Sequence, residues 1–240
     1  MQIKNTYKNI NNTKMKLNYD NRIVIKPWGE EYVIFKNKNK IAITYLKIKK
    51  GQSTSLHCHP QKKTGFLILS GNAKVQLGIY KKNTFIYKPM SILVLRAGLF
   101  HKIKASKYND LYALEIETPY NKKDLIRIED SYGRKDKDYE SLINTKKITK
   151  YHQVFKTPYK KKKQVYNLNK IKIELGYYKN FKKYSYINDR SVSIILDGSI
   201  TTRKGKKVIG IGEIVKSLTL KKLSEYFFIN KKILLLKAKK

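Results

Sequence analysis

The chain has 240 residues, of which 41% are hydrophobic and 12% aromatic, a composition that argues against wholesale disorder. No apolar run approaches the roughly 18–20 residues of a membrane-spanning helix, and the polar N-terminus lacks the apolar stretch of a secretory signal. The single cysteine, Cys58, excludes an intramolecular disulfide. We therefore expect a cytoplasmic protein without a membrane partner.

The formal net charge of +37 is the most unusual feature of the composition. A basic chain can attract nucleic acid, anionic lipid or acidic substrates. Only six of the 54 basic residues are arginine, however, and arginine is the residue that best recognises phosphates and base edges. The lysines are spread along the chain with many Ile, Asn and Tyr, as an AT-rich genome would produce. We expect a solvated lysine surface and no specific nucleic-acid partner; the alternative is attraction of an anionic small substrate.

A flexible leader is predicted for residues 1–21, which show no periodicity. After it, short apolar or alternating runs are separated by turns such as Ser70-Gly71. Runs at a spacing of about 8–12 residues are typical of an all-β sandwich or barrel. The runs occupy 41–50, 64–71, 72–80, 85–98, 100–105 and 111–119.

The charged segment 121–152 interrupts this rhythm and could carry a short helix. We predict one domain over 22–134, with its barrel at 26–119, and a linker over 135–164. Four consecutive lysines at 160–163 are typical of a solvated connector.

The last segment, 165–240, repeats the pattern of the first. SVSIILDGSI at 191–200 parallels TGFLILSGNA at 64–73, so that Gly198 corresponds to Gly71. Two later segment pairs align at similar offsets, which indicates an internal duplication. The repeat contains no histidine, so we predict a degenerate second lobe that is structural or closes over the site of the first.

Three histidines form the main candidate site. His57 and His59 are two residues apart after an alternating run, so their side chains point to the same face, and Cys58 faces the other way. His101 follows a turn containing Gly98 and begins a later strand. In an antiparallel barrel this strand can bring a third imidazole beside the first two. Three neutral imidazoles suit Zn, Fe, Ni or Cu and leave coordination positions open.

These residues resemble the cupin superfamily. Gly51, five residues, His57-Cys58-His59 and then Gly71 are similar to the first cupin motif, and Gly98-Leu99-Phe100-His101 to the second. The resemblance implies a double-stranded β-helix barrel, here a bicupin. It also implies a divalent metal, which we expect to be Zn, Fe, Mn or Ni. The glutamate ligand of the first motif is replaced by Lys63 or Thr64, and the proline of the second by Arg96.

A closer resemblance covers most of 26–134. Lys26-Pro27-Trp28-Gly29 near its start and Arg127-Ile128-Glu129-Asp130-Ser131-Tyr132-Gly133-Arg134 at its end are similar to the cupin of type II mannose-6-phosphate isomerases, also found fused to mannose-1-phosphate guanylyltransferases. The resemblance implies interconversion of aldose and ketose 6-phosphates, in which a metal polarises the sugar oxygens. The missing glutamate indicates a diverged relative that acts on phosphorylated or nucleotide-linked sugars, in surface-polysaccharide synthesis.

Further candidates surround the histidines. Glu115 and Lys63 are the candidate catalytic residues; Glu115 and Glu117 share one face, where either could act as a general base, although the simpler interpretation is that both face solvent. Arg96, Arg127 and Arg134 are the candidate substrate-binding residues, since a guanidinium group can clamp a phosphate. The alternative for the last two is pairing with Glu129 and Asp130.

Three functions remain open from the sequence. The first is a metal-dependent, isomerase-like or epimerase-like enzyme with a small anionic sugar substrate. The second is a non-catalytic sugar-binding or regulatory cupin, and the third is a three-histidine iron oxygenase. Each of these functions is compatible with a homodimer.

Overall fold

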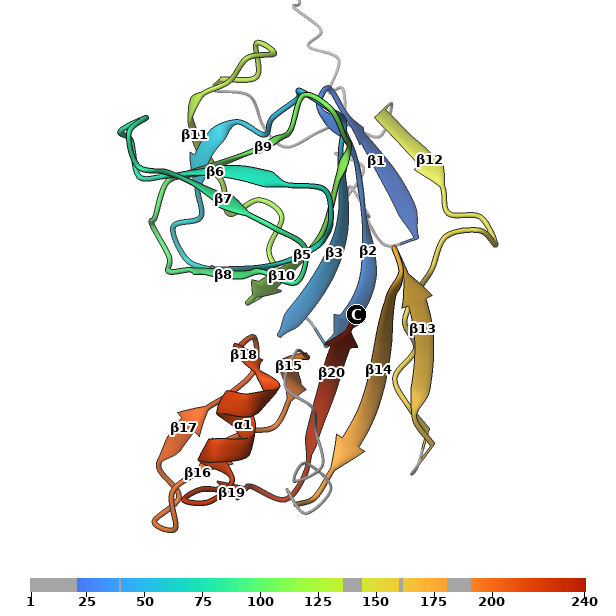
Figure 1. Cartoon of the computed structure of the whole chain (residues 1–240), viewed down its shortest axis with the longest axis vertical. Coiled ribbons are helices and arrows are strands. Elements are labelled where there is room, and N and C mark those ends of the chain that lie inside the picture. Colours follow the sequence, from blue (N-terminus) through green and yellow to red (C-terminus); the bar gives the residue numbers. More distant parts are fainter. Residues whose placement is uncertain (1–20, 39, 136–143, 160–161, 181–190) are drawn as a thin grey trace, which may run out of the picture.

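The computed structural model describes residues 21–38, 40–135, 144–159, 162–180 and 191–240. The leader predicted for 1–21 lies outside this part of the chain, apart from Asn21. The described residues form four antiparallel β-sheets and one short helix (Figure 1). The all-β prediction is therefore confirmed. Among these residues no helix has the length and apolar character needed to span a bilayer.

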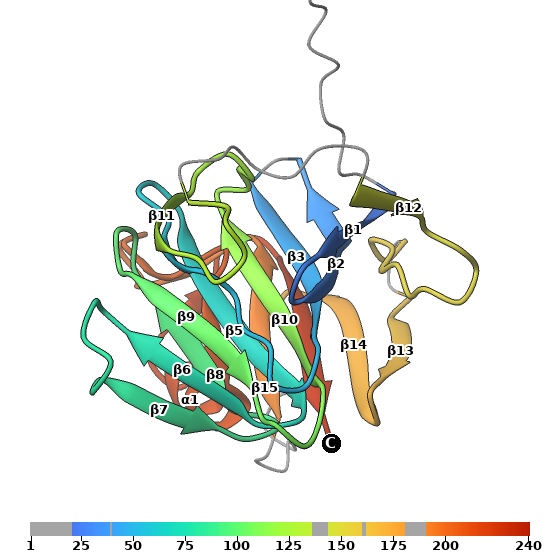
Figure 2. The same ribbon diagram turned by 90° about the horizontal axis from the view of Figure 1, so that it is seen from above.

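Two sheets form the first lobe, which we define as strands β1 to β12 (Figures 1 and 2). The larger sheet has the order β12-β1-β2-β3-β10-β5-β8, and the smaller has the order β11-β4-β9-β6-β7. Their apolar inner faces enclose one buried cluster around Trp28, Phe66 and Ile103. The strands are β1 (Arg22–Lys26), β2 (Gly29–Asn37), β3 (Ile41–Ile48), β4 (Leu56–Cys58), β5 (Lys63–Ser70), β6 (Ala73–Leu77), β7 (Thr84–Tyr87), β8 (Ile92–Leu95), β9 (His101–Ala105), β10 (Leu111–Thr118), β11 (Ile126–Glu129) and β12 (Thr145–Lys147).

The second lobe, strands β13 to β20, repeats this arrangement. Its larger sheet has the order β13-β14-β20-β15-β18, which corresponds strand by strand to β2-β3-β10-β5-β8. Its smaller sheet has the order β17-β16-β19, which corresponds to β7-β6-β9. The elements are β13 (Gln164–Leu168), β14 (Ile171–Tyr178), β15 (Val192–Asp197), β16 (Ile200–Thr201), β17 (Lys207–Ile209), β18 (Ile214–Lys216), α1 (Ser217–Leu223), β19 (Phe228–Ile229) and β20 (Ile233–Lys239).

Two glycines show the correspondence at the level of the backbone. Gly71 follows β5 with φ +78°, and a Cβ there would lie 2.3 Å from the Asp110 carbonyl oxygen, just before β10. Gly198 follows β15 with φ +79°, and its Cβ would lie 2.4 Å from the Lys232 carbonyl oxygen, just before β20. The counterpart of β4 would fall near 181–190, outside the described residues. A complete second barrel therefore stays a prediction.

The two lobes share a hydrophobic core. The outer faces of β3, β5 and β10 pack against β14, β15 and β20 in a single buried cluster. The segment predicted as a linker takes part in this packing: β12 pairs with β1, and Phe155 is buried in the shared core and donates its backbone N–H to the Ile34 carbonyl oxygen at 2.7 Å. The short helix considered for 121–152 does not occur in the described part of that segment, which contains β11 and β12.

Burial on both sides of β10 explains an error in the sequence interpretation. Leu114 and Ile116 face the shared core, so the alternating Glu115 and Glu117 face the interior of the first barrel. They are only 8% and 1% exposed, and the expectation that they face solvent is wrong. A period-2 pattern identifies two faces, but it does not tell which of them meets water.

Candidate metal centre

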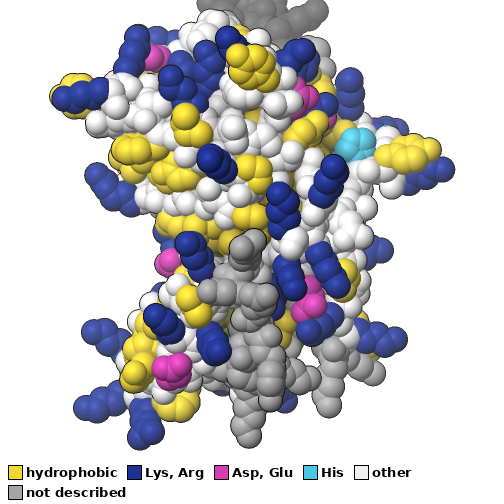
Figure 3. Space-filling model, in the orientation of Figure 1, with side chains coloured by type: hydrophobic (Ala, Val, Ile, Leu, Met, Phe, Trp, Pro, Cys, Tyr) yellow, Lys and Arg dark blue, Asp and Glu magenta, His cyan; other side chains and the backbone are white. Residues whose placement is uncertain are grey.

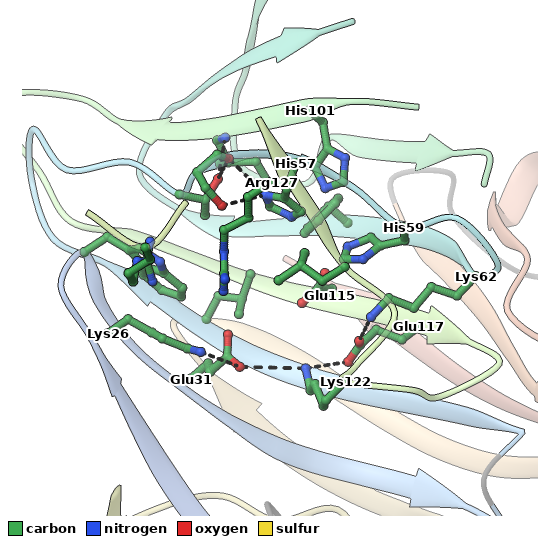
Figure 4. Close-up of a pocket in the computed structure, with 18 residues that line it drawn as sticks. Lys26, Glu31, His57, His59, Lys62, His101, Glu115, Glu117, Lys122 and Arg127 are labelled. Atoms are coloured by element: carbon green, nitrogen blue, oxygen red, sulfur yellow. Dashed lines mark hydrogen bonds and ion pairs between the residues drawn. The ribbon is translucent and has the colours of Figure 1, made fainter. Parts of the chain in front are cut away.

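Two neighbouring strands, β4 and β9, bring the histidines together in one pocket of the first barrel (Figure 4). His57 lies on β4 directly opposite His101, the first residue of β9, and His59 follows β4 on the same side as His57. The imidazole centroids are 4.4 Å apart for His57 and His101, 5.1 Å for His57 and His59, and 5.4 Å for His59 and His101. One nitrogen from each ring lies within 4.8 Å of the other two. The predicted convergence is confirmed.

Hydrogen bonds to backbone carbonyls fix the tautomer of each imidazole. His57 Nδ1 donates to the Ser55 oxygen at 2.9 Å, and His101 Nδ1 donates to the Leu99 oxygen at 3.1 Å. His59 Nδ1 donates to the Asp124 oxygen at 2.6 Å. Each Nε2 therefore carries the lone pair, as in metal-binding histidines held by an outer carbonyl.

The Nε2 atoms of His59 and His101 are buried, and neither has a hydrogen-bond partner among the residues that the structure describes. Burial lowers the pKa of His59 to about 3 and of His101 to about 4, and it lowers that of His57 well below its ordinary value. The three rings are thus neutral near pH 7, which is the form that binds a metal. Orphaned, convergent lone pairs on neutral imidazoles fit a divalent transition metal.

The pocket beside the imidazoles is lined by many charged groups. Five cations line it, together with three carboxylates and the apolar side chains of Trp28 and Phe66. The cations are Lys26, Lys62, Lys122, Arg127 and Arg134, and the carboxylates are Glu31, Glu115 and Glu117. With the histidines neutral, the formal charge of this wall is positive whenever its side chains carry their ordinary charges.

A chain of buried ion pairs forms one side of the pocket (Figure 4). Glu117 is held between Lys62 at 2.6 Å and Lys122 at 2.7 Å. Lys122 also approaches Glu31 at 3.8 Å, and Glu31 approaches Lys26 at 3.7 Å. Burial opposes ionisation of Glu117, but Lys122 and Lys62 outweigh it and hold its pKa below the ordinary range. Glu117 is therefore an ionised carboxylate fully occupied by two ammonium groups.

Glu115 has a different environment although it lies on the same face of β10. Burial, and then the neighbouring charge of Glu117, raise its pKa to about 7. Among the described residues, its carboxylate has neither a hydrogen bond nor an ion-pair partner within 4 Å. A carboxylate in such a place binds a proton or a cation readily.

The remaining predicted site residues divide into two groups. Arg127 and Arg134 line the pocket, and Arg134 is also paired with Asp130 at 2.7 Å, as the alternative interpretation expected. Lys63 and Arg96 lie outside the pocket lining. Lys63 forms an ion pair with Glu213 of the second lobe, and Arg96 is exposed and donates to the Ala97 carbonyl oxygen. Their position does not support a catalytic role for Lys63 or a substrate-binding role for Arg96.

Sequence reasoning missed several pocket residues. Lys62, which directly precedes β5, lines the pocket together with Phe66, whereas Lys63 does not; the period of two from Lys62 to Phe66 was the available signal. Lys26, Glu31 and Lys122 gave no local signal, because only the tertiary fold brings them to the site. Trp28 is 5% exposed and packs in the barrel core at the edge of the pocket, and Cys58 is buried outside the pocket lining.

On the face shown in Figure 3, lysine and arginine side chains are scattered among neutral and hydrophobic ones. They do not gather there into a single groove. This distribution agrees, for that face, with the expectation of a solvated lysine surface.

Comparison with known proteins gives one family and several distant structures. Residues 12–130 match the family described as mannose-6-phosphate isomerase, C-terminal. No curated protein matches the chain in sequence. KdgF from Halomonas sp. is 14% identical, with 40% of this chain and 85% of that chain covered and a TM-score of 0.37.

Two further structures are similarly distant. A conserved protein with a double-stranded β-helix domain from Klebsiella pneumoniae is 19% identical over 42% of this chain and 79% of that chain, with a TM-score of 0.37. The capsular polysaccharide assembling protein CapF from Staphylococcus aureus is 15% identical over 45% of this chain, with a TM-score of 0.40, and only 34% of that chain is covered. The strand order and the family match carry the assignment: the first lobe is a cupin barrel that resembles the C-terminal domain of mannose-6-phosphate isomerases.

Proposed function

We propose that the first lobe is a divalent-metal cupin that acts on a phosphorylated or nucleotide-linked sugar, with isomerase-like chemistry. One observation carries the proposal: three neutral imidazoles, whose Nδ1 atoms are held by backbone carbonyls, each bring one nitrogen within 4.8 Å of the other two in a pocket with a positively charged wall. Of the predicted metals, Zn, Fe and Ni accept imidazole ligands well, whereas Mn favours oxygen ligands. A role in surface-polysaccharide synthesis belongs to the same proposal.

His57, His59 and His101 would hold the metal, which supplies a Lewis acid that polarises a sugar oxygen. Arg127, Arg134 and Lys26 place positive charge along the pocket, where it attracts the phosphate of a substrate. Asp130 fixes the guanidinium group of Arg134 at the pocket wall. Phe66 and Trp28 supply apolar surface that limits access of water.

A non-catalytic sugar-binding cupin is the second candidate, and a specific observation favours it. Glu117 is neutralised by two lysines, and the buried Thr64 has no carboxylate to offer. Turnover would then depend on Glu115 as the acid–base group, and that role stays a prediction.

The proposal can be tested on the full chain loaded separately with Zn²⁺, Mn²⁺, Ni²⁺ and Fe²⁺. Binding of mannose 6-phosphate, fructose 6-phosphate and GDP-mannose is measured by calorimetry, with unphosphorylated mannose as the control, and conversion is followed by NMR. We expect metal-dependent binding of the phosphorylated sugars and isomerisation of at least one. Binding without conversion would favour the second candidate, and oxygen consumption by the iron form would favour an oxygenase. Absence of metal from the wild-type chain would overturn the proposal.

A further inference from the structure

We propose that Glu115 supplies the carboxylate of the metal centre, so that the anionic ligand comes from β10 and not from β5. This inference rests on the proposed function, because it requires that His57, His59 and His101 bind a divalent metal. It concerns a different residue and a different strand from the glutamate position at Thr64.

The first argument is the position of Glu115. It lies inside the barrel, directly opposite Phe66 in the β10–β5 pairing, and the ring of Phe66 is 6.0 Å from the ring of His101. Figure 4 shows the Glu115 side chain in the part of the pocket between the imidazoles and the Glu117–Lys62 pair. The carboxylate and the three imidazoles therefore belong to the same cavity.

The second argument is the lack of a partner. Glu115 is 8% exposed, and no described residue hydrogen-bonds to its carboxylate or pairs with it within 4 Å. The nearest lysines, Lys62 and Lys122, are both bound to Glu117 at hydrogen-bond distance. A buried carboxylate without a partner is costly unless a proton or a cation neutralises it. The convergent Nε2 atoms define a cation site in the same pocket.

The third argument is charge balance. Three neutral imidazoles leave the full charge of a divalent ion uncompensated in a wall whose five cations already outnumber its three carboxylates. One carboxylate lowers that charge, and Glu117 cannot do so because two lysines hold it. The Glu115 carboxylate is not among the atoms that lie within 4.8 Å of one another, so rotation about its side-chain torsions must bring it to the metal.

The test is the metal affinity of Glu115→Gln, measured by chelator competition with Zn²⁺ and by the visible spectrum of the Co²⁺ form. We expect affinity to fall about 10- to 100-fold, as when a group that supports a metal site is removed, and the Co²⁺ bands to shift. The matched control is Glu129→Gln, which removes an equal charge from an exposed position on β11. It should leave both readouts at the wild-type values.

A second variant tests whether a carboxylate on β5 can replace the one on β10. Adding Thr64→Glu to Glu115→Gln places a carboxylate on the inner face of β5, opposite Glu117. We expect this double variant to recover most of the lost affinity. Circular dichroism and thermal melting of each metal-free variant establish that it is folded before its affinity is compared.

The outcomes separate this inference from the proposed function. If the wild-type chain binds Zn²⁺ and Glu115→Gln binds it equally well, the inference is overturned while the three-histidine site stands. Unchanged affinity with lost sugar turnover would give Glu115 the general-base role instead. If the wild-type chain and His101→Ala both fail to bind metal, the proposed function and this inference fall together.

Discussion

Glu117 lies directly opposite Thr64 across the β10–β5 pair, inside the barrel of the first lobe. Thr64 is 1% exposed, and its hydroxyl has no hydrogen-bond partner in the described part of the chain. The strand next to the expected ligand position therefore carries a carboxylate, but two lysines hold it in place. This pairing makes Glu117 a structural anchor of the pocket wall and leaves Glu115 as the pocket carboxylate without an ion-pair partner among the described residues.

The anchor role of Glu117 predicts a large loss of stability in Glu117→Gln. The change leaves Lys62 and Lys122 buried without their anion, which costs about 3–5 kcal/mol for buried pairs. Urea denaturation at pH 7 measures the loss. The control is Glu213→Gln, which breaks the half-exposed pair with Lys63 and should cost about 1 kcal/mol or less. Equal losses in the two variants would contradict the anchor role.

The same ion pairs predict a pH dependence of the wild-type chain. Lys122 and Lys62 outweigh the effect of burial and hold the pKa of Glu117 below its ordinary value of 4.5. The unfolded chain thus takes up the proton first as the pH falls. The stabilisation is complete above pH 4.5 and is lost only as the pH falls through the lowered pKa. Glu117→Gln should lack this acid-dependent part of the unfolding curve.

Glu115 predicts the opposite trend in the metal-free chain. Burial and the charge of Glu117 raise its pKa from 4.5 to about 7, so between these values the folded chain binds the proton more tightly. Stability should fall as the pH rises from 4.5 to 7, by about 3 kcal/mol at most. Glu115→Gln should remove this slope and be more stable than the wild type at pH 8. If the free energies of unfolding of the wild type and Glu115→Gln differ by the same amount at pH 5 and at pH 8, this assignment is contradicted.

Much of the fold and the histidine site followed from local patterns, whereas the charged wall did not. The spacing of His57 and His59 places both side chains on one face of a strand, and the turn at Gly98 marks the start of the strand that begins with His101. Each of these signals spans only a few residues of sequence. Glu115 lines the pocket, as a catalytic candidate must; the simpler interpretation that it and Glu117 face solvent failed because the sheet is buried on both faces. Lys63 was chosen in place of Lys62 because a shift of one residue along a strand exchanges its faces. Lys122 lies in the loop after β10 and pairs with Glu117 because that loop folds back, which no periodicity of the sequence predicts.

The duplicated glycines provide a test of the correspondence between the lobes. Gly71→Ala and Gly198→Ala should each destabilise the chain by more than about 1 kcal/mol, since a positive φ strains alanine and the new Cβ would overlap a carbonyl oxygen. Gly205→Ala is the control, because its φ is +79° but a Cβ there meets nothing within 4 Å. In urea denaturation, Gly71→Ala and Gly198→Ala should have similar free energies of unfolding, and both should be lower than that of Gly205→Ala.

The scattered lysines predict weak, nonspecific contact with nucleic acid. We expect affinities no tighter than about 10⁻⁶ M near physiological salt, since nonspecific binding alone falls in the range of about 10⁻⁴–10⁻⁶ M. Titration with duplex and single-stranded DNA at several salt concentrations measures this. Submicromolar binding that persists near physiological salt would show that the lysines do form a nucleic-acid surface.

The last prediction concerns the three imidazoles themselves. His57→Ala, His59→Ala and His101→Ala should each lower the metal content of the purified chain, because each removes one Nε2 atom from a group that converges within 4.8 Å. X-ray absorption of the wild-type Zn²⁺ form should show nitrogen ligands at about 2.0–2.1 Å. The variants should still fold, because the imidazoles line the pocket and the largest buried side chains lie elsewhere in the barrel. His152→Ala is the matched control, since His152 lies outside the pocket against Tyr32 and its loss should leave metal content unchanged. Metal content that falls equally in His152→Ala, or in none of the variants, would contradict a centre built from His57, His59 and His101.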